Sequence, residues 1–260
     1  TNPMKLEGLV AVVTGGSSGL GEAAVYKLAE AGCKIVIGDV NEEAGAKVVE
    51  KVGKDKAIFV KTDVTDEEAC NNLIAEAVKA FGAVHVCLNS AGVIALTPTI
   101  TSKGTAKASD LLRLLKINVI GTFNVAKAAA LQMTKQKTIS DKDERGVIIN
   151  VASVSGIEGP KNLVSYSASK GAIIGMTLPL ARDLGKFGIR VMALAPGIFL
   201  TPMSNYYPEK ALEGIRKQTP VGRLGDPPEF GDAVVAIAQN SFMTGEVIRL
   251  DGAYKVGYIQ

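Results

Sequence analysis

Histidine and cysteine are scarce in this chain of 260 residues, and their scarcity excludes several kinds of site. His85, the only histidine, lies inside an apolar run, so we expect it to be packed in a strand rather than to bind a metal or serve a Ser-His-Asp triad. Cys33, Cys70 and Cys87 are odd in number and far apart, which favours free thiols in a reducing compartment. We therefore predict no metal site.

Long apolar runs and a strong net charge are also missing. No apolar run approaches 18 residues, so we expect no membrane span. The first five residues contain no apolar region, which argues against a signal peptide there. The net charge of +3 is mild and gives no case for nucleic acid as the main ligand. With 47% hydrophobic residues, the chain can form a sizeable core.

Short apolar runs alternate with helical segments along the whole chain, and no linker interrupts them. This order predicts an α/β fold in which residues 1–260 form a single Rossmann-type, doubly wound domain of about seven parallel strands with helices on both faces. The expected strands are 9–13, 34–39, 57–60, 84–88, 189–194 and 246–250, with the run 146–153, which ends in a turn. The expected helices are 22–31, 42–52, 66–81, a segment capped at 109–110 that runs to 133, 165–184, and one that opens at 227.

A glycine-rich turn, Thr14-Gly-Gly-Ser-Ser-Gly-Leu-Gly21, lies between the first strand and the first helix. In this context glycines let a pyrophosphate approach the helix N-terminus, where free N–H groups favour anions. The spacing differs from the usual G-x-G-x-x-G, and a plain left-handed turn is the alternative. The cofactor-binding residues predicted here are Gly15, Ser17, Ser18, Gly19, Leu20 and Gly21.

Asp39 ends the second strand, 18 residues after Gly21. A carboxylate at this place suits the ribose hydroxyls of NAD and repels the additional phosphate of NADP. Neither Ser18 nor Val40 is a basic residue that would accept that phosphate. The alternative is a solvated carboxylate at the end of a strand.

Two more strand ends carry candidate cofactor contacts. Asp63, followed by Val64, could accept a hydrogen bond from adenine or could cap the helix expected near Thr65, and both interpretations stay open. The turn Asn89-Ser-Ala-Gly92 follows the strand 84–88, on the side where α/β sheets bind ligands. The predicted contacts are Asp63, Val64, Asn89, Ala91 and Gly92.

Tyr166 and Lys170 lie four residues apart in an expected helix, so their side chains share one face. A phenol has a pKa of about 10, and an ammonium group beside it favours the phenolate and lowers that pKa. A tyrosine in this setting can act as a general acid and base. Ser153 could hydrogen-bond a substrate oxygen. An accidental Tyr-x-x-x-Lys in a helix rich in Ala and Ser is the alternative.

Two loops and one helical position add further candidates. The acid-free loop 95–109 carries Lys103 and Lys107, and a loop of this length is usually functional or disordered. The apolar segment 198–207 is expected to be a substrate lid. Asn118 lies in the middle of a helix and faces either solvent or the site. Around the lid we predict cofactor contacts at Pro196, Gly197, Phe199 and Thr201 and substrate contacts at Leu200 and Met203.

The ordered motifs resemble the short-chain dehydrogenase/reductase family along the whole chain. They are Thr14-Gly15, Gly19-Leu-Gly21, Asn89-Ser-Ala-Gly92, Asn118, Ser153, Tyr166-x-x-x-Lys170 and Pro196-Gly197. The resemblance implies that Tyr166 is the acid and base, supported by Lys170, which also binds ribose. It further implies that Ser153 holds the substrate oxygen and that Asn118 steadies a water molecule of a proton relay.

Within this family the chain resembles mitochondrial enzymes that oxidise 3-hydroxyacyl-CoA and hydroxysteroids. The similar stretches are Arg145–Asn150, Gly175–Leu184, Gly188–Met192, Arg223–Asp226 and Gly245–Gly252. This implies an NAD-dependent enzyme of the mitochondrial matrix, or otherwise of the cytoplasm, that interconverts hydroxyl and keto groups. With such substrates, Lys103 and Lys107 either meet the phosphates of coenzyme A or are ordinary solvated lysines. Because helix 168–184 is apolar nearly all round and related enzymes pair through it, we expect a homotetramer.

Two alternatives and two departures qualify this resemblance. A 3-oxoacyl-carrier-protein reductase would usually prefer NADP, which Asp39 opposes. A non-catalytic subunit of a mitochondrial tRNA-processing complex would contact nucleic acid, but no strong basic stripe supports this. Leu200 stands where a glycine is expected before Thr201, and Ser90 replaces the more usual Asn or Cys. The first departure puts the choice of substrate in question.

Overall fold

A seven-stranded parallel sheet forms the centre of the computed structural model, which describes residues 4–102, 104–139 and 143–257. The strand order is β3-β2-β1-β4-β7-β8-β9, so the chain moves outward from β1 on one side and then on the other. This confirms the predicted α/β fold of about seven parallel strands. The strands are β1 (Val10–Thr14), β2 (Lys34–Asp39), β3 (Ala57–Lys61), β4 (Val86–Asn89), β7 (Gly146–Val151), β8 (Ile189–Pro196) and β9 (Val247–Leu250).

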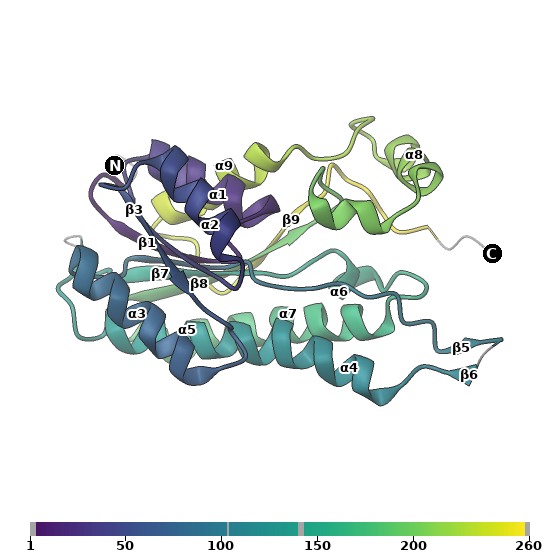
Figure 1. Ribbon diagram of the computed structural model, residues 1–260, viewed down its shortest axis with the longest axis horizontal. Helices are drawn as coiled ribbons and strands as arrows, with labels where there is room; N and C mark the ends of the chain where they lie inside the picture. Colours follow the sequence, from purple (N-terminus) through teal and green to yellow (C-terminus); the bar gives the residue numbers. More distant parts are fainter. Residues whose placement is uncertain (1–3, 103, 140–142, 258–260) are drawn as a thin grey trace.

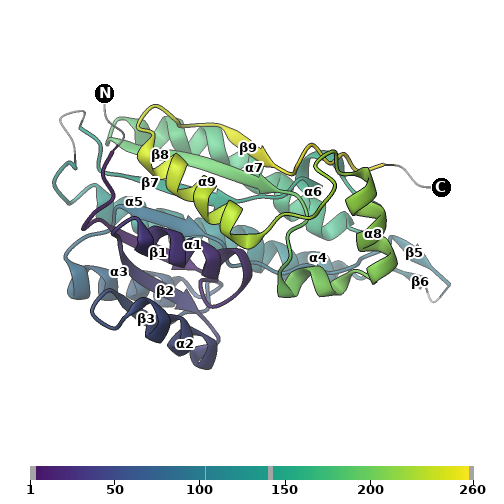
Figure 2. The ribbon, with the colours of Figure 1, turned by 90° about the horizontal axis from the view of Figure 1, so that it is seen from above.

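Helices cover both faces of the sheet, which is why the central strands are apolar throughout (Figures 1 and 2). On one face, α1 (Gly19–Glu30) and α9 (Pro227–Gln239) pack against each other and share a core with β1, beside α2 (Glu42–Val52). On the other face, α3 (Glu67–Phe81), α5 (Gly121–Met133) and α7 (Val164–Gly185) cover a second core. The shorter elements are α6 (Ser155–Glu158), the 3-10 helix η2 (Pro202–Tyr206) and α8 (Glu209–Gln218).

His85 lies just before β4 and joins the sheet rather than a functional site. Its Nδ1 accepts a hydrogen bond from Val10 N at 3.0 Å, and its own backbone N–H donates to Val10 O at 2.8 Å. Burial lowers the pKa of the imidazole, which favours the neutral form that can accept this bond. The lone histidine is therefore packed, as its surroundings in the sequence predict.

A π-helical turn interrupts the helix expected to run to Met133. The segment begins with α4 (Ala108–Leu114), continues through the π turn η1 (Leu115–Ile120) and ends in α5. Helix α4 starts after Lys107, so the predicted start at residues 109–110 is slightly late. Single π turns are rare and occur often at functional sites.

The same helical run, Ala108–Met133, passes the length and composition test for a membrane span among the described residues. Length and composition alone do not test the expectation of no membrane span, because a buried core helix has the same properties. In the structure 56% of its most apolar window is buried, as in a helix that packs against a sheet within a core.

A short antiparallel hairpin replaces the irregular loop expected at 95–109. Strand β5 (Ile100–Thr101) pairs with β6 (Gly104–Thr105), and the hairpin extends beyond the rest of the molecule (Figures 1 and 2). Lys103, one of the two lysines singled out in this loop, is outside the described residues.

A buried ion pair joins the segment before β7 to β8. Arg190 Nε lies 2.7 Å from Glu144 Oε1, and the two side chains are only 7% and 5% exposed. The guanidinium also donates to the carbonyls of Ile237, Ala238 and Met243, which ties β8 to the end of α9. The second carboxylate oxygen of Glu144 is buried and has no partner in the part of the chain that the structure describes.

We predict that Glu144→Ala lowers the free energy of unfolding by about 3–5 kcal/mol, because the Arg190 charge would stay buried and unpaired. Denaturant unfolding followed by circular dichroism measures the change. The matched control is Glu213→Ala, which removes the partner of the exposed Lys217 and should have little effect. Equal small losses for both variants would show that the buried pair does not stabilise this sheet.

Candidate active site

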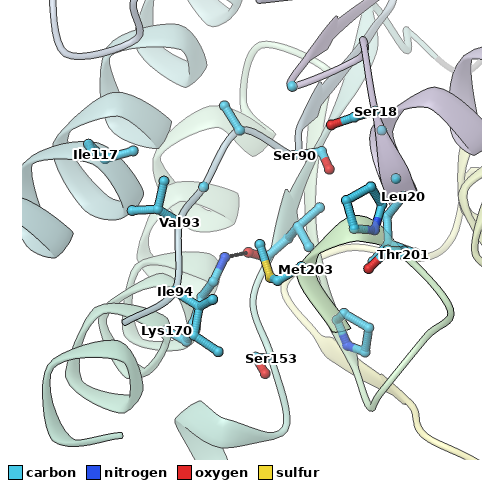
Figure 3. Close-up of a pocket in the computed structure, with 18 of the residues that line it drawn as sticks. Ser18, Leu20, Ser90, Val93, Ile94, Ile117, Ser153, Lys170, Thr201 and Met203 are labelled. Carbon is cyan, nitrogen blue, oxygen red and sulfur yellow. Dashed lines mark hydrogen bonds between the residues drawn. The ribbon is translucent and has the colours of Figure 1, made fainter. Parts of the chain in front are cut away.

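A cleft of about 870 Å³ opens at the carboxyl ends of the strands, where the strand order reverses between β1 and β4 (Figure 3). Most of the residues predicted for the site line this cleft. They are Gly15, Ser18, Gly19, Leu20, Gly21, Asp39, Asp63, Val64, Ala91, Gly92, Ser153, Tyr166, Lys170, Pro196, Gly197, Phe199, Thr201 and Met203.

The glycine-rich turn packs too closely for larger residues. A Cβ atom on Gly15 would lie 2.8 Å from the backbone of Ala91, and one on Gly21 would collide with the carbonyl oxygen of Gly15. Ser18 is the N-cap residue of α1, but its side chain makes no capping hydrogen bond. The first N–H groups of α1 therefore have no side-chain cap, and they are suited to an anion.

Ser17 lies behind this turn rather than in the lining of the cleft. Its backbone N–H donates to Asp39 Oδ2 at 3.1 Å, and its hydroxyl is buried without a partner. Asp39 Oδ1 also accepts from Asn41 N at 3.0 Å. Asp39 is therefore attached to the glycine turn while it lines the cleft, and it is not simply a solvated strand end.

Asp63 does not cap the next helix, because α3 begins at Glu67 and its N-cap is Asp66. Asp66 accepts from two backbone N–H groups of the first turn, whereas Asp63 Oδ1 accepts only from Thr65 N, at 2.9 Å. The capping interpretation of Asp63 is wrong. Its carboxylate and the neighbouring Val64 line the cleft, as the adenine interpretation requires.

Asn89 also differs from its predicted place. It is buried below the turn that it begins, and its Nδ2 donates to Asn150 Oδ1 at 2.8 Å. Cys87 lies within a weak hydrogen-bond distance of the same side chain, at 3.8 Å from its Oδ1. Asn89 therefore supports the turn from beneath instead of lining the cleft.

Ser153, Tyr166 and Lys170 meet in one wall of the cleft, and each is at most 7% exposed. The ammonium group of Lys170 donates to the carbonyl of Val151 at 2.6 Å, and this bond joins α7 to the end of β7 (Figure 3). Its Nζ lies 5.9 Å from the centre of the Tyr166 ring. Helical spacing thus brings the two residues together, but the ammonium is directed at a carbonyl rather than at the phenol oxygen.

Burial controls the protonation of both residues. It raises the pKa of Tyr166 to about 12, although a hydrogen bond with Ser153 acts in the opposite direction. It lowers the pKa of Lys170 to about 8. The predicted lowering of the Tyr166 pKa by Lys170 is therefore not found in this structure, where burial has the largest influence on that pKa.

Asn118 lies in the π turn and is completely buried, so the interpretation that it faces solvent is wrong. Its side-chain amide exchanges two hydrogen bonds of 2.9 Å with the backbone of Val93. Its Nδ2 donates a third, to Ser169 Oγ, also at 2.9 Å. A Cβ on Gly92 would lie 3.2 Å from Asn118 Oδ1 and 3.6 Å from Lys170 Nζ, so these groups converge beneath the turn.

The lid segment 198–207 is partly helical and its residues face different ways. Phe199 is buried and packs edge-on against Phe230, with ring centres 6.3 Å apart. Leu200 is 49% exposed and lines a groove behind the lid instead of the cleft, so the predicted substrate contact at Leu200 is not supported. Met203 and Thr201 line the cleft as predicted.

Several lining residues were missed at the sequence level. Val93 and Ile94 continue the turn after Gly92, and Tyr207 packs with Tyr166 and Ile94 in a small apolar cluster. The apolar composition of segment 198–207 was the signal for Tyr207. Val93 and Ile94 follow a recognised turn directly, and this was the only indication for them.

The cations at the cleft also differ from those predicted. Lys107 is exposed and does not line the cleft, and Lys103 lies outside the described residues. Arg113 and Lys116, from α4 and the π turn, line it instead. The coenzyme A contact predicted for Lys107 therefore has no support from this geometry.

Comparisons with known proteins agree with this architecture. A family model described as short chain dehydrogenase matches residues 9–211. The human protein named 3-hydroxyacyl-CoA dehydrogenase type-2 is 44% identical over 96% of this chain and 97% of its own length. A 3-oxoacyl-[acyl-carrier-protein] reductase of Thermotoga maritima is 34% identical over 96% of this chain and 98% of its own.

The fold comparison gives the same answer. A crystal structure of 3-hydroxyacyl-CoA dehydrogenase type-2 from Mycobacterium avium matches with a TM-score of 0.91 and 34% identity, over 96% of this chain and 97% of that one. Members of the matched family use nicotinamide cofactors of the NAD(P) type. On this evidence the chain belongs to the short chain dehydrogenase family and is an oxidoreductase.

Proposed function

We propose that this enzyme uses NAD to interconvert hydroxyl and keto groups on 3-hydroxyacyl-CoA and hydroxysteroid substrates, with the whole chain acting as one unit. The observation that carries the proposal is the meeting of buried Ser153, Tyr166 and Lys170 in a cleft that the glycine turn also lines. The printed names of the relatives supply the acyl-CoA part of the substrate class. The steroid part comes from the resemblance of the sequence alone.

The residues near Asp39 fit NAD. The absence of space for side chains at Gly15 and Gly21 suits a closely held ribose and pyrophosphate. The Asp39 carboxylate lines the cleft beside Val40, and it would repel the additional phosphate of NADP. These features support NAD over NADP and argue against the carrier-protein reductase alternative.

The proton chemistry follows from burial. Bound cofactor would supply or accept the hydride, while Ser153 holds the substrate oxygen and Tyr166 exchanges a proton with it. Because the pKa of Tyr166 is about 12, the phenol is protonated at neutral pH, the form that donates to a carbonyl under reduction. Alcohol oxidation needs the phenolate, which Lys170 favours while it is charged, below its pKa of about 8.

The cleft supports an apolar substrate with an anionic end. Ile94, Phe199 and Met203 form apolar walls, and Arg113 and Lys116 supply positive charge that phosphates of coenzyme A would meet. A mitochondrial matrix location, or otherwise a cytoplasmic one, stays a prediction from the resemblance. So does a role as a non-catalytic subunit of a tRNA-processing complex.

We predict that Tyr166→Phe lowers kcat by at least about 100-fold, because it removes the proton donor but keeps the ring. The assay is NADH formation from a panel of hydroxyacyl-CoA and steroid alcohols. The same assay with NADP in place of NAD tests whether Asp39 excludes the additional phosphate. Tyr26→Phe, which removes a phenol bonded to Glu22 outside the cleft, is the matched control. Near-normal turnover by Tyr166→Phe would remove this residue from the mechanism.

We also predict a homotetramer. Helices α5 and α7 lie on one face of the sheet (Figure 1), and Leu131 and Leu178 there are 59% and 43% exposed. Leu112 of α4 is 64% exposed, so the apolar surface continues along the same helical run. Light scattering at micromolar concentration should give a mass near four times 27.1 kDa, and a monomer would contradict the prediction.

A further inference from the structure

We propose that Ser169 is a positioning residue, which ties the catalytic helix α7 to the π turn at Asn118 and so fixes the place of the Tyr166 phenol. The inference rests on the proposed acid–base role of Tyr166. It concerns a residue that does not line the cleft.

Ser169 is completely buried, and its hydroxyl both donates and accepts a hydrogen bond. The Oγ donates to the carbonyl oxygen of Tyr166 at 2.7 Å and accepts from Asn118 Nδ2 at 2.9 Å. One hydroxyl thus joins the backbone of the catalytic tyrosine to a side chain of a different helix. In a buried site each of these bonds is costly to lose, because no water replaces the partner.

The connection continues from Asn118 to the cleft itself. The remaining hydrogen bonds of the Asn118 amide hold the backbone of Val93, which lines the cleft directly after Gly92. In a regular α-helix the backbone hydrogen bonds join residues four positions apart. In a π turn such as Leu115–Ile120, which contains Asn118, they join residues five positions apart. The result is a continuous path of hydrogen bonds from the turn after β4, through Asn118 and Ser169, to Tyr166.

Two other contacts hold the same part of α7. Lys170 donates to Val151 O at 2.6 Å, on the side of β7. Gly156 of α6 packs so closely that a Cβ there would lie 2.7 Å from Gly171 N. Tyr166 is therefore held from β7 and from α6, and Ser169 supplies the third contact, on the side of the β4 turn. Without it, Asn118 has a buried N–H without a partner and the tyrosine is free to shift on that side.

The test is Ser169→Ala, and the chain offers two matched controls on the same helix. Ser167 has a buried hydroxyl with no partner among the described residues, one residue from Tyr166, so Ser167→Ala removes the same atom without breaking a bond seen in the structure. Thr177 is buried and donates to Ile173 O at 2.9 Å, so Thr177→Val removes a comparable bond two turns further along. Stability is followed by thermal unfolding.

We expect Ser169→Ala to lower kcat on the order of 10-fold, since small misplacements of a catalytic group have large effects on rate. The dissociation constant for NADH should stay within about twofold of the unmodified enzyme, because the glycine turn is untouched. Thr177→Val should lose a similar amount of thermal stability with kcat unchanged, and Ser167→Ala should change neither. A purely structural role for Ser169 would make it behave like Thr177.

Repeating the substitution in an Asn118→Ala background tests the path directly. We expect Ser169→Ala to add less than about twofold there, because the connection is already broken. Equal losses in both backgrounds would overturn the proposal.

If Ser169→Ala does not fold, Ser169→Cys keeps the shape with weaker hydrogen bonds and should lower kcat several-fold. An unchanged kcat in Ser169→Cys would overturn the proposal. Tyr166→Phe in the same assay separates the two claims: an active variant refutes the proposed function, whereas an inactive one with unaffected Ser169→Ala refutes only this inference.

Discussion

The hydrogen bond from Lys170 Nζ to the Val151 carbonyl is the contact on which the arrangement of the site depends. It joins the catalytic helix α7 to the end of the central strand β7 at 2.6 Å. An ammonium is costly to remove from water, and the pKa of Lys170, lowered to about 8, reflects that cost. The carbonyl offsets part of it and holds the lysine beside Tyr166, with Nζ 5.9 Å from the centre of the ring.

This geometry separates two tasks that a Tyr-x-x-x-Lys pair could combine. Lys170 anchors a helix and brings a positive charge near the ring, while Ser153 hydrogen-bonds the phenol. Burial then keeps Tyr166 protonated at neutral pH. Reduction of a carbonyl thus starts from the form that the free protein already favours, and oxidation of an alcohol requires additional stabilisation of the phenolate within the complex.

The sequence was informative where residue spacing places a side chain, or where a strand is apolar because both faces of the sheet are covered. The strands were found because central parallel strands are apolar throughout, and Asp39 was found because it ends one of them. The π turn at Asn118 was missed, because its register depends on bonds to Val93 and Ser169 rather than on helix propensity. Leu200 was misplaced for a similar reason, since composition identifies a lid but not the direction of each side chain.

The account's central claim is that burial, and not Lys170, governs the ionisation of Tyr166 in the free protein. Ultraviolet titration tests it most directly. The measured quantity is the difference in phenolate absorbance between the unmodified chain and Tyr166→Phe at each pH. We predict no such difference below about pH 10, the pKa of an ordinary phenol, because burial raises that of Tyr166 to about 12. A phenolate that appears near neutral pH without cofactor would contradict the account.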